Sequence, residues 1–143
     1  MEVKIKKLNK DAVIPSYAHN TDAGMDLTAT TYKYDNTIDC HIYGTGIAME
    51  IPEGYVGLLF PRSSNRKTNS YLTNHVGIID SGYRGEIMFS FKNRTAGNNV
   101  KPYNVGDRLG QIIIMPYPKI KLIQVDELSE TERGTGGHGS TGN

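Results

Sequence analysis

The sequence predicts an all-β protein, either a sandwich or a closed barrel. Apolar residues recur with a period of two, which is typical of strands that bury one face. Residues that favour turns separate these stretches at short intervals. No stretch of useful length has the 3.6-residue period of an amphipathic helix. The chain has 143 residues, 16 of them glycine, so we expect one domain with a real core and many turns.

The predicted strands follow the alternation along the chain. Four of them have apolar residues that share one face: Val3 and Ile5; Ile38, Cys40 and Ile42; Ile47, Met49 and Ile51; and Ile87, Phe89 and Phe91. Residues 110–115 (GQIIIM) and 120–125 (IKLIQV) supply later strands, and the former is apolar enough to lie inside.

Turn signals lie between these runs. They are PEG at 52–54, SG at 81–82, AGNN at 96–99 and VGD at 105–107. Only residues 63–69 and 128–132 could form a helical turn or two.

Composition excludes several function classes. A formal net charge of +1 predicts no binding to nucleic acid or to an acidic membrane. Cys40 is the single cysteine, so an intrachain disulfide is excluded and a reducing compartment is expected. Its place in an alternating stretch favours a buried core thiol over a nucleophile. No apolar run suits a signal peptide or a membrane span, so we expect a cytoplasmic protein. The four histidines lack the spacing of metal ligands.

The segment NHVGIIDSGYRGE, residues 74–86, is the first candidate for chemistry. An apolar strand end delivers Asp80 into a turn that holds Tyr83 between Gly82 and Gly85. Asp80 by itself fits a turn residue that bonds its own backbone. The alternative is a hairpin that presents backbone groups to a planar ring, with the tyrosine packed beside that ring.

Two further segments could bind anions. In FPRSSN, residues 60–65, Pro61 ends a strand and leaves Arg62 beside two serines at a possible helix start. The other reading is a serine N-cap with a solvated arginine. In GDRLGQ, residues 106–111, Gln111 is either an edge residue or a ligand group.

The tail RGTGGHGSTGN, residues 133–143, is the only low-complexity segment. Successive glycine N–H groups can converge on an anion, and Arg133, Ser140 and Thr141 would add hydrogen bonds. The default for such a terminus is disorder.

Taken in order, these segments resemble the five motifs of the trimeric dUTPase family. The matching segments are AGMDL at 23–27, PRSS at 61–64, GIIDSGYRGE at 77–86, GDRLGQ at 106–111 and RGTGGHGSTG at 133–142. They cover almost the whole chain. Two residues depart from the pattern: Met25 stands where the family often has tyrosine, and His138 where a phenylalanine usually stacks on uracil. An imidazole can also lie flat on a base.

The resemblance implies a fold and an assembly. We expect a jelly-roll-like β-barrel over residues 1–132 and a glycine-rich arm over residues 133–143 that closes on the active site. Three copies would form a homotrimer with three shared sites. Each site would take the third motif from one subunit, the second and fourth from a neighbour, and the fifth from the third chain.

The resemblance also implies a reaction, the hydrolysis of dUTP to dUMP and pyrophosphate. This reaction limits uracil in DNA and supplies dUMP for thymidylate synthesis. Asp80 would be catalytic, activating a water that attacks the α-phosphorus. The base and sugar would be bound by Asn74, Gly77, Ile79, Tyr83, Met88 and His138. The triphosphate would be bound by Arg62, Ser63, Ser64, Gln111, Arg133, Gly139, Ser140 and Thr141.

Magnesium is the implied cofactor. It prefers oxygen ligands, keeps several waters and binds substrate phosphates, so no direct protein ligand is expected. Asp26 would reach the metal through water. Two alternatives to dUTP hydrolysis stay open: a dCTP deaminase of the same fold, and a regulatory binding protein that uses the nucleotide as a switch.

Overall fold

The computed structural model describes residues 1–95 and 100–137. Within these ranges the chain forms strands and one short 3-10 helix, η1, and no α-helix. The elements are β1 (Lys4–Lys7), β2 (Met25–Thr28), β3 (Thr31–Asp35), β4 (Cys40–Gly44), β5 (Ile47–Glu50), β6 (Tyr55–Pro61), η1 (Ser63–Lys67), β7 (Ser70–Leu72), β8 (Gly77–Ile79), β9 (Met88–Asn93) and β10 (Arg108–Pro116). The all-β prediction is confirmed. No helix of the described residues is long and apolar enough to cross a membrane.

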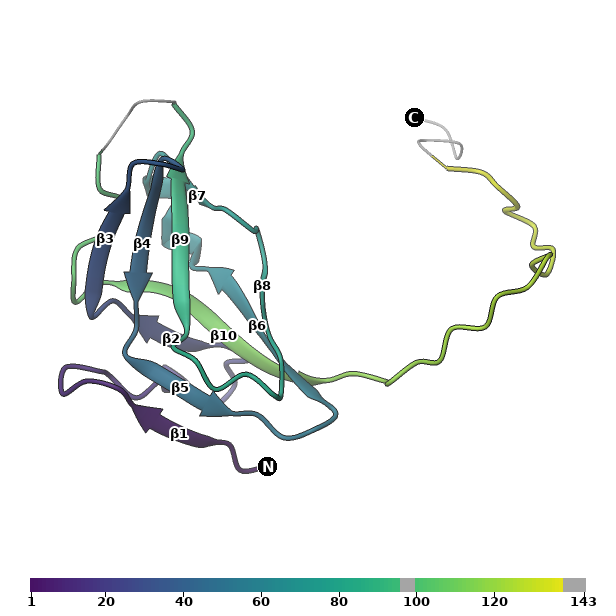
Figure 1. Cartoon of the computed structure of the whole chain (residues 1–143), viewed down its shortest axis with the longest axis horizontal. Coiled ribbons are helices and arrows are strands. Elements are labelled where there is room, and N and C mark those ends of the chain that lie inside the picture. Colours follow the sequence, from purple (N-terminus) through teal and green to yellow (C-terminus); the bar gives the residue numbers. More distant parts are fainter. Residues whose placement is uncertain (96–99, 138–143) are drawn as a thin grey trace.

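Two four-stranded sheets build the body of the molecule (Figure 1). Their strand orders are β2-β10-β6-β8 and β3-β4-β9-β7, and β1 pairs with β5 as a separate ribbon. The pairings within the described ranges are antiparallel. The core lies between the sheets, where alternate side chains of their strands point inward.

The core face of β4 differs from the prediction. Phe89 and Phe91 of β9 are buried as expected, but their partners across the ladder are Tyr43 and His41. Ile38 falls in the turn before β4 and is 52% exposed. The prediction failed because Tyr43 can be buried with its hydroxyl satisfied, donating to the Tyr103 carbonyl at 2.9 Å.

The local signals for turns and for the helical turn hold where the structure describes them. Residues 63–67 form η1, whereas 128–132 form no helix. Gly54 and Gly106 adopt φ values of +85° and +95°, which suit glycine in the turns predicted at 52–54 and 105–107. The turn predicted at 96–99 lies outside the described residues.

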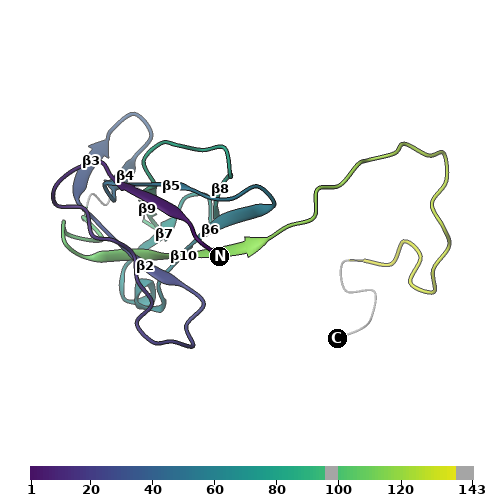
Figure 2. The same ribbon diagram turned by 90° about the horizontal axis from the view of Figure 1, so that it is seen from below.

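The strand predicted at 120–125 is absent. After β10 the chain leaves the β-body and runs away from it in both views (Figures 1 and 2). Apolar side chains are exposed along it, including Leu122 at 86% and Leu128 at 88%. The alternation is real, but no strand of residues 1–95 or 100–137 pairs with this segment. The boundary expected at residue 132 stays a prediction.

A buried imidazole makes the fold sensitive to acid. His41 is 1% exposed, and its ring nitrogens lie 3.0 Å from the Tyr32 hydroxyl and 3.2 Å from the Asn93 amide nitrogen. Burial lowers the pKa of His41 from its ordinary 6.5. The unfolded chain therefore binds the proton first as the pH falls, so stability is lost below about pH 6.5.

We expect the unfolding temperature to fall more between about pH 7.5 and about pH 5.5 in the parent than in His41→Gln. The glutamine keeps polar groups in place but does not titrate in this range. His19→Gln is the matched control, because it makes the same substitution at an imidazole whose side chain is 80% exposed. Equal slopes in the parent and His41→Gln would contradict the role of His41.

Candidate active site

Asp26 gathers residues from three of the predicted motifs. Its carboxylate, 15% exposed, accepts hydrogen bonds from Arg62 Nε at 2.8 Å, Arg108 Nη1 at 3.0 Å and Gln111 Nε2 at 3.3 Å. Two guanidinium charges on one carboxylate leave excess positive charge, which suits an anionic ligand. Arg62 and Gln111 were predicted phosphate ligands, and the structure brings them together.

Strand register explains this cluster. In the β2–β10 ladder Asp26 lies directly opposite Gln111, and β10 in turn places Gly110 opposite Pro61 of β6. Pro61 ends β6, so Arg62 turns away from the ladder toward the Asp26 carboxylate. The register of the β2–β10 pairing shifts between Arg108 and Gly110. Such an irregularity changes the direction of the side chains at the end of a ladder.

Ser63 and Ser64 begin η1 directly after Arg62. The N-cap residue, Arg62, makes no side-chain capping hydrogen bond, and the last turn of the helix carries Arg66 and Lys67. Ser63 is exposed and Ser64 is partly buried. Both predicted phosphate ligands therefore lie next to the arginine of the Asp26 cluster.

A second group of predicted residues lines a hollow of about 290 Å³ at the end of β8. Its lining residues are Ile78, Ile79, Asp80, Tyr83, Glu86, Met88 and Ser90. Asp80 follows the last residue of β8 and is exposed. The predicted catalytic carboxylate and the predicted sugar residue, Tyr83, thus share one hollow.

The Tyr83 ring is held across the turn. Its hydroxyl donates to the Glu86 carbonyl at 2.9 Å, and its backbone N–H donates to the Asp80 carbonyl at 3.0 Å. The ring passes over Gly85, where a Cβ would lie 2.9 Å from Tyr83 Cε2 and closer still to the hydroxyl. Glycine at 85 is therefore required for this ring position.

The backbone predicted to read the base is available for binding. β8 is an edge strand, paired only with β6 within its sheet, so its outward N–H and C=O groups face away from the ladder. Gly77 and Ile79 are buried while Ile78 is exposed. Asn74 is exposed in the turn before β8 and does not line the hollow.

The two groups lie at opposite ends of β6. Ile79 pairs with Gly57, so Asp80 lies beyond that end of the ladder, whereas Arg62 follows Pro61 at the other end. The five steps along the strand from Gly57 to Arg62 span about 17 Å at about 3.3 Å per residue. One chain therefore does not bring Asp80 and Arg62 to the same phosphate.

The described part of the tail touches neither group. Arg133 is exposed on the segment that leaves the body, and its Nε donates to the Gly136 carbonyl at 2.9 Å (Figure 2). His138, Gly139, Ser140 and Thr141 lie outside the described residues.

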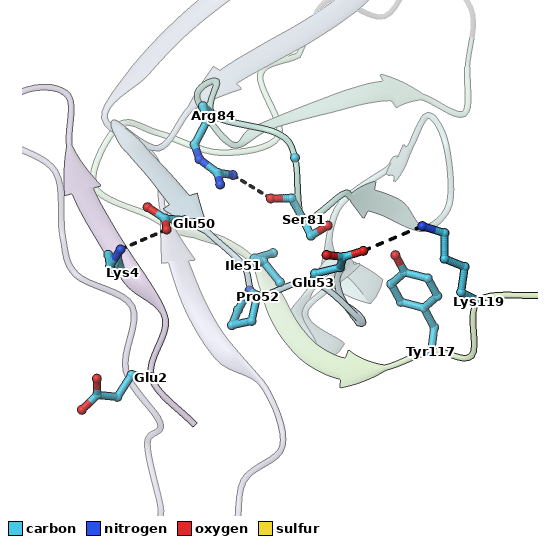
Figure 3. Close-up of a pocket in the computed structure, with 11 residues that line it drawn as sticks. Glu2, Lys4, Glu50, Ile51, Pro52, Glu53, Ser81, Arg84, Tyr117 and Lys119 are labelled. Atoms are coloured by element: carbon cyan, nitrogen blue, oxygen red, sulfur yellow. Dashed lines mark hydrogen bonds and ion pairs between the residues drawn. The ribbon is translucent and has the colours of Figure 1, made fainter.

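A larger hollow lies elsewhere. It measures about 530 Å³ and lies between β1, β5 and the turn that follows β8 (Figure 3). Four of its charges form two ion pairs, Lys4 with Glu50 at 3.0 Å and Lys119 with Glu53 at 3.7 Å. Glu2 and Arg84 also line it. The smaller hollow, by contrast, is the one lined by Asp80 and Tyr83 of the segment 77–86.

Comparison with known proteins decides the family. Residues 10–142 match the family model described as dUTPase. The chain belongs to the dUTPase family. The deoxyuridine 5'-triphosphate nucleotidohydrolase of Clostridium tetani is 41% identical over 141 residues, covering 98% of this chain and 96% of that protein. The same enzyme from Nautilia profundicola is 41% identical over 143 residues, covering 99% of each.

Solved dUTPase structures have the same fold. The Staphylococcus bacteriophage 80alpha dUTPase with dUpNHpp is 30% identical, with a TM-score of 0.83 and 99% coverage of both chains. A mutant dUTPase from phage phi11 of S. aureus, reported with a structural Mg(II) ion, is 28% identical. Its TM-score is 0.73, with coverage of 89% of this chain and 98% of that one. The predicted dUTPase family and barrel fold are confirmed.

Sequence reasoning missed three residues of these groups. Arg108 binds Asp26, while Glu86 and Ser90 line the hollow. Arg108 and Glu86 stand inside quoted motifs, so their position was a usable signal. Ser90 carries no such signal, because only its pairing partner in the sheet reveals where it faces.

Proposed function

We propose that this dUTPase hydrolyses dUTP to dUMP and pyrophosphate, with Asp80 as the catalytic base. The observation that carries the proposal is the exposed Asp80 carboxylate at the lip of a hollow lined by Tyr83, Ile79 and Met88. The names of the curated relatives and the bound dUpNHpp of the phage enzyme support the substrate. The matches favour this reaction over dCTP deamination.

Asp80 orients a water and removes its proton. A carboxylate is an acceptor at neutral pH, and its exposed position lets a water lie within hydrogen-bond reach. The water oxygen bonds to the α-phosphorus as the bond from that phosphorus to the leaving pyrophosphate oxygen breaks. The proton passes to Asp80.

The open edge of β8 selects the base. Backbone donors and acceptors from Gly77 to Ile79 match uracil, and cytosine would leave them unpaired, which is costly in a desolvated site. Asn74 precedes this edge, and His138 stacks on the base from the arm. Tyr83 packs on the deoxyribose and leaves no room for a 2′-hydroxyl.

Positive charge and hydroxyls bind the triphosphate. The proposed ligands are Arg62, Ser63, Ser64, Gln111, Arg133, Gly139, Ser140 and Thr141. Asp26 positions two of these ligands, because its carboxylate accepts hydrogen bonds from Arg62 and Gln111 and holds both side chains in place before the substrate binds.

The residues present fit a magnesium ion carried mainly by the substrate. Within the described ranges no three His, Cys, Asp or Glu residues gather as a metal cage. Asp26 accepts three hydrogen bonds, and a carboxylate offers about four acceptor positions, so it can also accept one from a metal-bound water. Bound magnesium would neutralise charge on the phosphates.

A homotrimer completes the site. Asp80 and Arg62 lie beyond opposite ends of a stretch of β6 that is about 17 Å long, which supports a site that takes one of the two groups from a second copy. The exposed apolar residues from Ile120 to Leu128 support such an assembly, since a lone chain leaves them in water. The arm of residues 133–143 would close over a site on another subunit. A cytoplasmic location stays a prediction from the sequence.

Pyrophosphate release tests the reaction. Purified protein is given dUTP with magnesium, with magnesium chelated, and with dTTP, UTP or dCTP as competitors. We expect release from dUTP that requires magnesium and is weakly inhibited by the three competitors. Ammonia release from dCTP would instead identify a deaminase, and intact dUTP would contradict the proposal.

A methyl group at residue 85 should weaken sugar selection. Gly85→Ala forces the Tyr83 ring to move, so the ratio of kcat/KM for UTP to that for dUTP should rise by about tenfold. Gly82→Ala is the matched control, because no atom lies within 4 Å of the Cβ it would add. A rise of similar size in both variants would contradict the role of the ring position.

A further inference from the structure

We propose that Glu86 is a positioning residue for sugar selection. Its carboxylate ties the end of the turn of residues 80–85 to the connection between β4 and β5, and so holds the turn in place relative to the Glu86 carbonyl that accepts from the Tyr83 hydroxyl. The inference rests on the proposed function, because selection between dUTP and UTP is measured in that reaction.

The tie is a hydrogen bond across the fold. The Gly46 N–H donates to Glu86 Oε1 at 2.7 Å, joining residues 40 positions apart. Gly46 is buried and has a φ of +67°, a conformation that glycine adopts without strain. Removing the carboxylate would leave this buried donor without its acceptor, which is unfavourable.

Residue 86 directly follows the turn, and its side chain is tied to Gly46. The next residue is held separately, since Ile87 N–H donates to the Ile47 carbonyl at 2.8 Å and Thr45 Oγ1 donates to the Ile87 carbonyl at 2.7 Å. Because the peptide bond is planar, the bond from Ile87 N–H also orients the Glu86 carbonyl, but it leaves rotation about the Cα–C bond of residue 86 open. Without the Glu86 carboxylate, the turn is free to hinge at residue 86.

The Tyr83 ring depends on that carbonyl. Tyr83 is 41% exposed, so packing alone does not fix its ring, and its hydroxyl is anchored to the Glu86 carbonyl at 2.9 Å. Arg84 holds only the backbone of the turn, donating from Nη1 to the Ser81 and Tyr83 carbonyls. Excluding a single hydroxyl from a ribose requires the ring to stay in place to within about 1 Å.

Three substitutions at residue 86 test the proposal, with kcat/KM measured for dUTP and for UTP. Glu86→Gln keeps an acceptor oxygen for the Gly46 N–H, so the UTP-to-dUTP ratio should stay within about twofold of the parent. Glu86→Ala removes the acceptor. Glu86→Asp shortens the side chain by one methylene, so its carboxylate falls short of the Gly46 N–H. Both substitutions should therefore raise the UTP-to-dUTP ratio by about tenfold or more. If Glu86→Ala fails to fold, Glu86→Asp carries the test.

The ratio separates positioning from stability, because a merely less stable protein loses both activities in proportion. An unchanged ratio in Glu86→Ala or Glu86→Asp overturns the inference. Failure of the parent to hydrolyse dUTP overturns the proposed function instead, so the two failures are distinguishable.

A double-mutant cycle tests the route through the tyrosine. In the Tyr83→Phe background the hydroxyl is already gone, so Glu86→Ala should change the ratio by less than about twofold. Full additivity of the two changes would show that Glu86 acts by another route and would contradict the proposal.

Discussion

Asp80→Asn should abolish measurable turnover of dUTP, a loss of about 10²–10⁴-fold in kcat, the usual contribution of a general base. The Kd for dUpNHpp should stay within about tenfold of the parent, because the change removes mainly transition-state stabilisation. Asparagine keeps the shape of the side chain at the lip of the hollow but cannot take the proton. Steady-state kinetics and equilibrium titration measure the two quantities.

Asp11→Asn is the matched control for this result. Asp11 is also exposed, but it lies between β1 and β2 and does not line the hollow. We expect parental kcat in this variant. Equal rates in Asp80→Asn and the parent would remove Asp80 from its catalytic role.

A chain that ends at Glu132 should stay folded and lose most of its activity, by about tenfold or more, because a closing segment excludes water and completes the site. Among the residues that the structure describes, the last strand ends at Pro116 and no core residue follows residue 132. Thermal unfolding should therefore match the parent, while kcat/KM for dUTP should fall.

A chain that ends at Gly142 is the control for truncation, since it keeps the whole fifth motif. This chain should retain parental activity. If the chain that ends at Glu132 hydrolyses dUTP as fast as the parent, the arm does not act as a lid.

Strands with strong alternation could be predicted from the sequence, because the period-two pattern and burial follow the same physics. Phe89 and Phe91 illustrate this, since both are buried as expected. The pattern was misleading at β4, where aromatic side chains with polar tips form the core face and an isoleucine falls in a turn. Alternation alone does not say which of two faces is buried when both contain large side chains.

The strand predicted at 120–125 shows a second limit. A strand needs a partner for its backbone groups, and sequence periodicity contains no information about where that partner is. Its exposed apolar residues, such as Leu122, are consistent with a partner on another copy of the chain.

Motif residues of the candidate site could be named from the sequence, whereas their mutual arrangement could not. The bonds that join Asp26 to Arg62 and Arg108 cross 36 and 82 residues of sequence. They arise from the register of β2, β10 and β6, which only the folded sheet reveals. The separation of Asp80 from Arg62 along β6 has the same origin.

Mixing two inactive variants tests the shared site most directly. Asp80→Asn retains Arg62, and Arg62→Ala retains Asp80, so a site that takes each group from a different subunit can be intact in a mixed assembly. After the two are unfolded together and refolded at equal amounts, random mixing in a trimer should restore about one quarter of parental activity. Activity no higher than the sum of the two variants refolded alone would contradict a site shared between subunits.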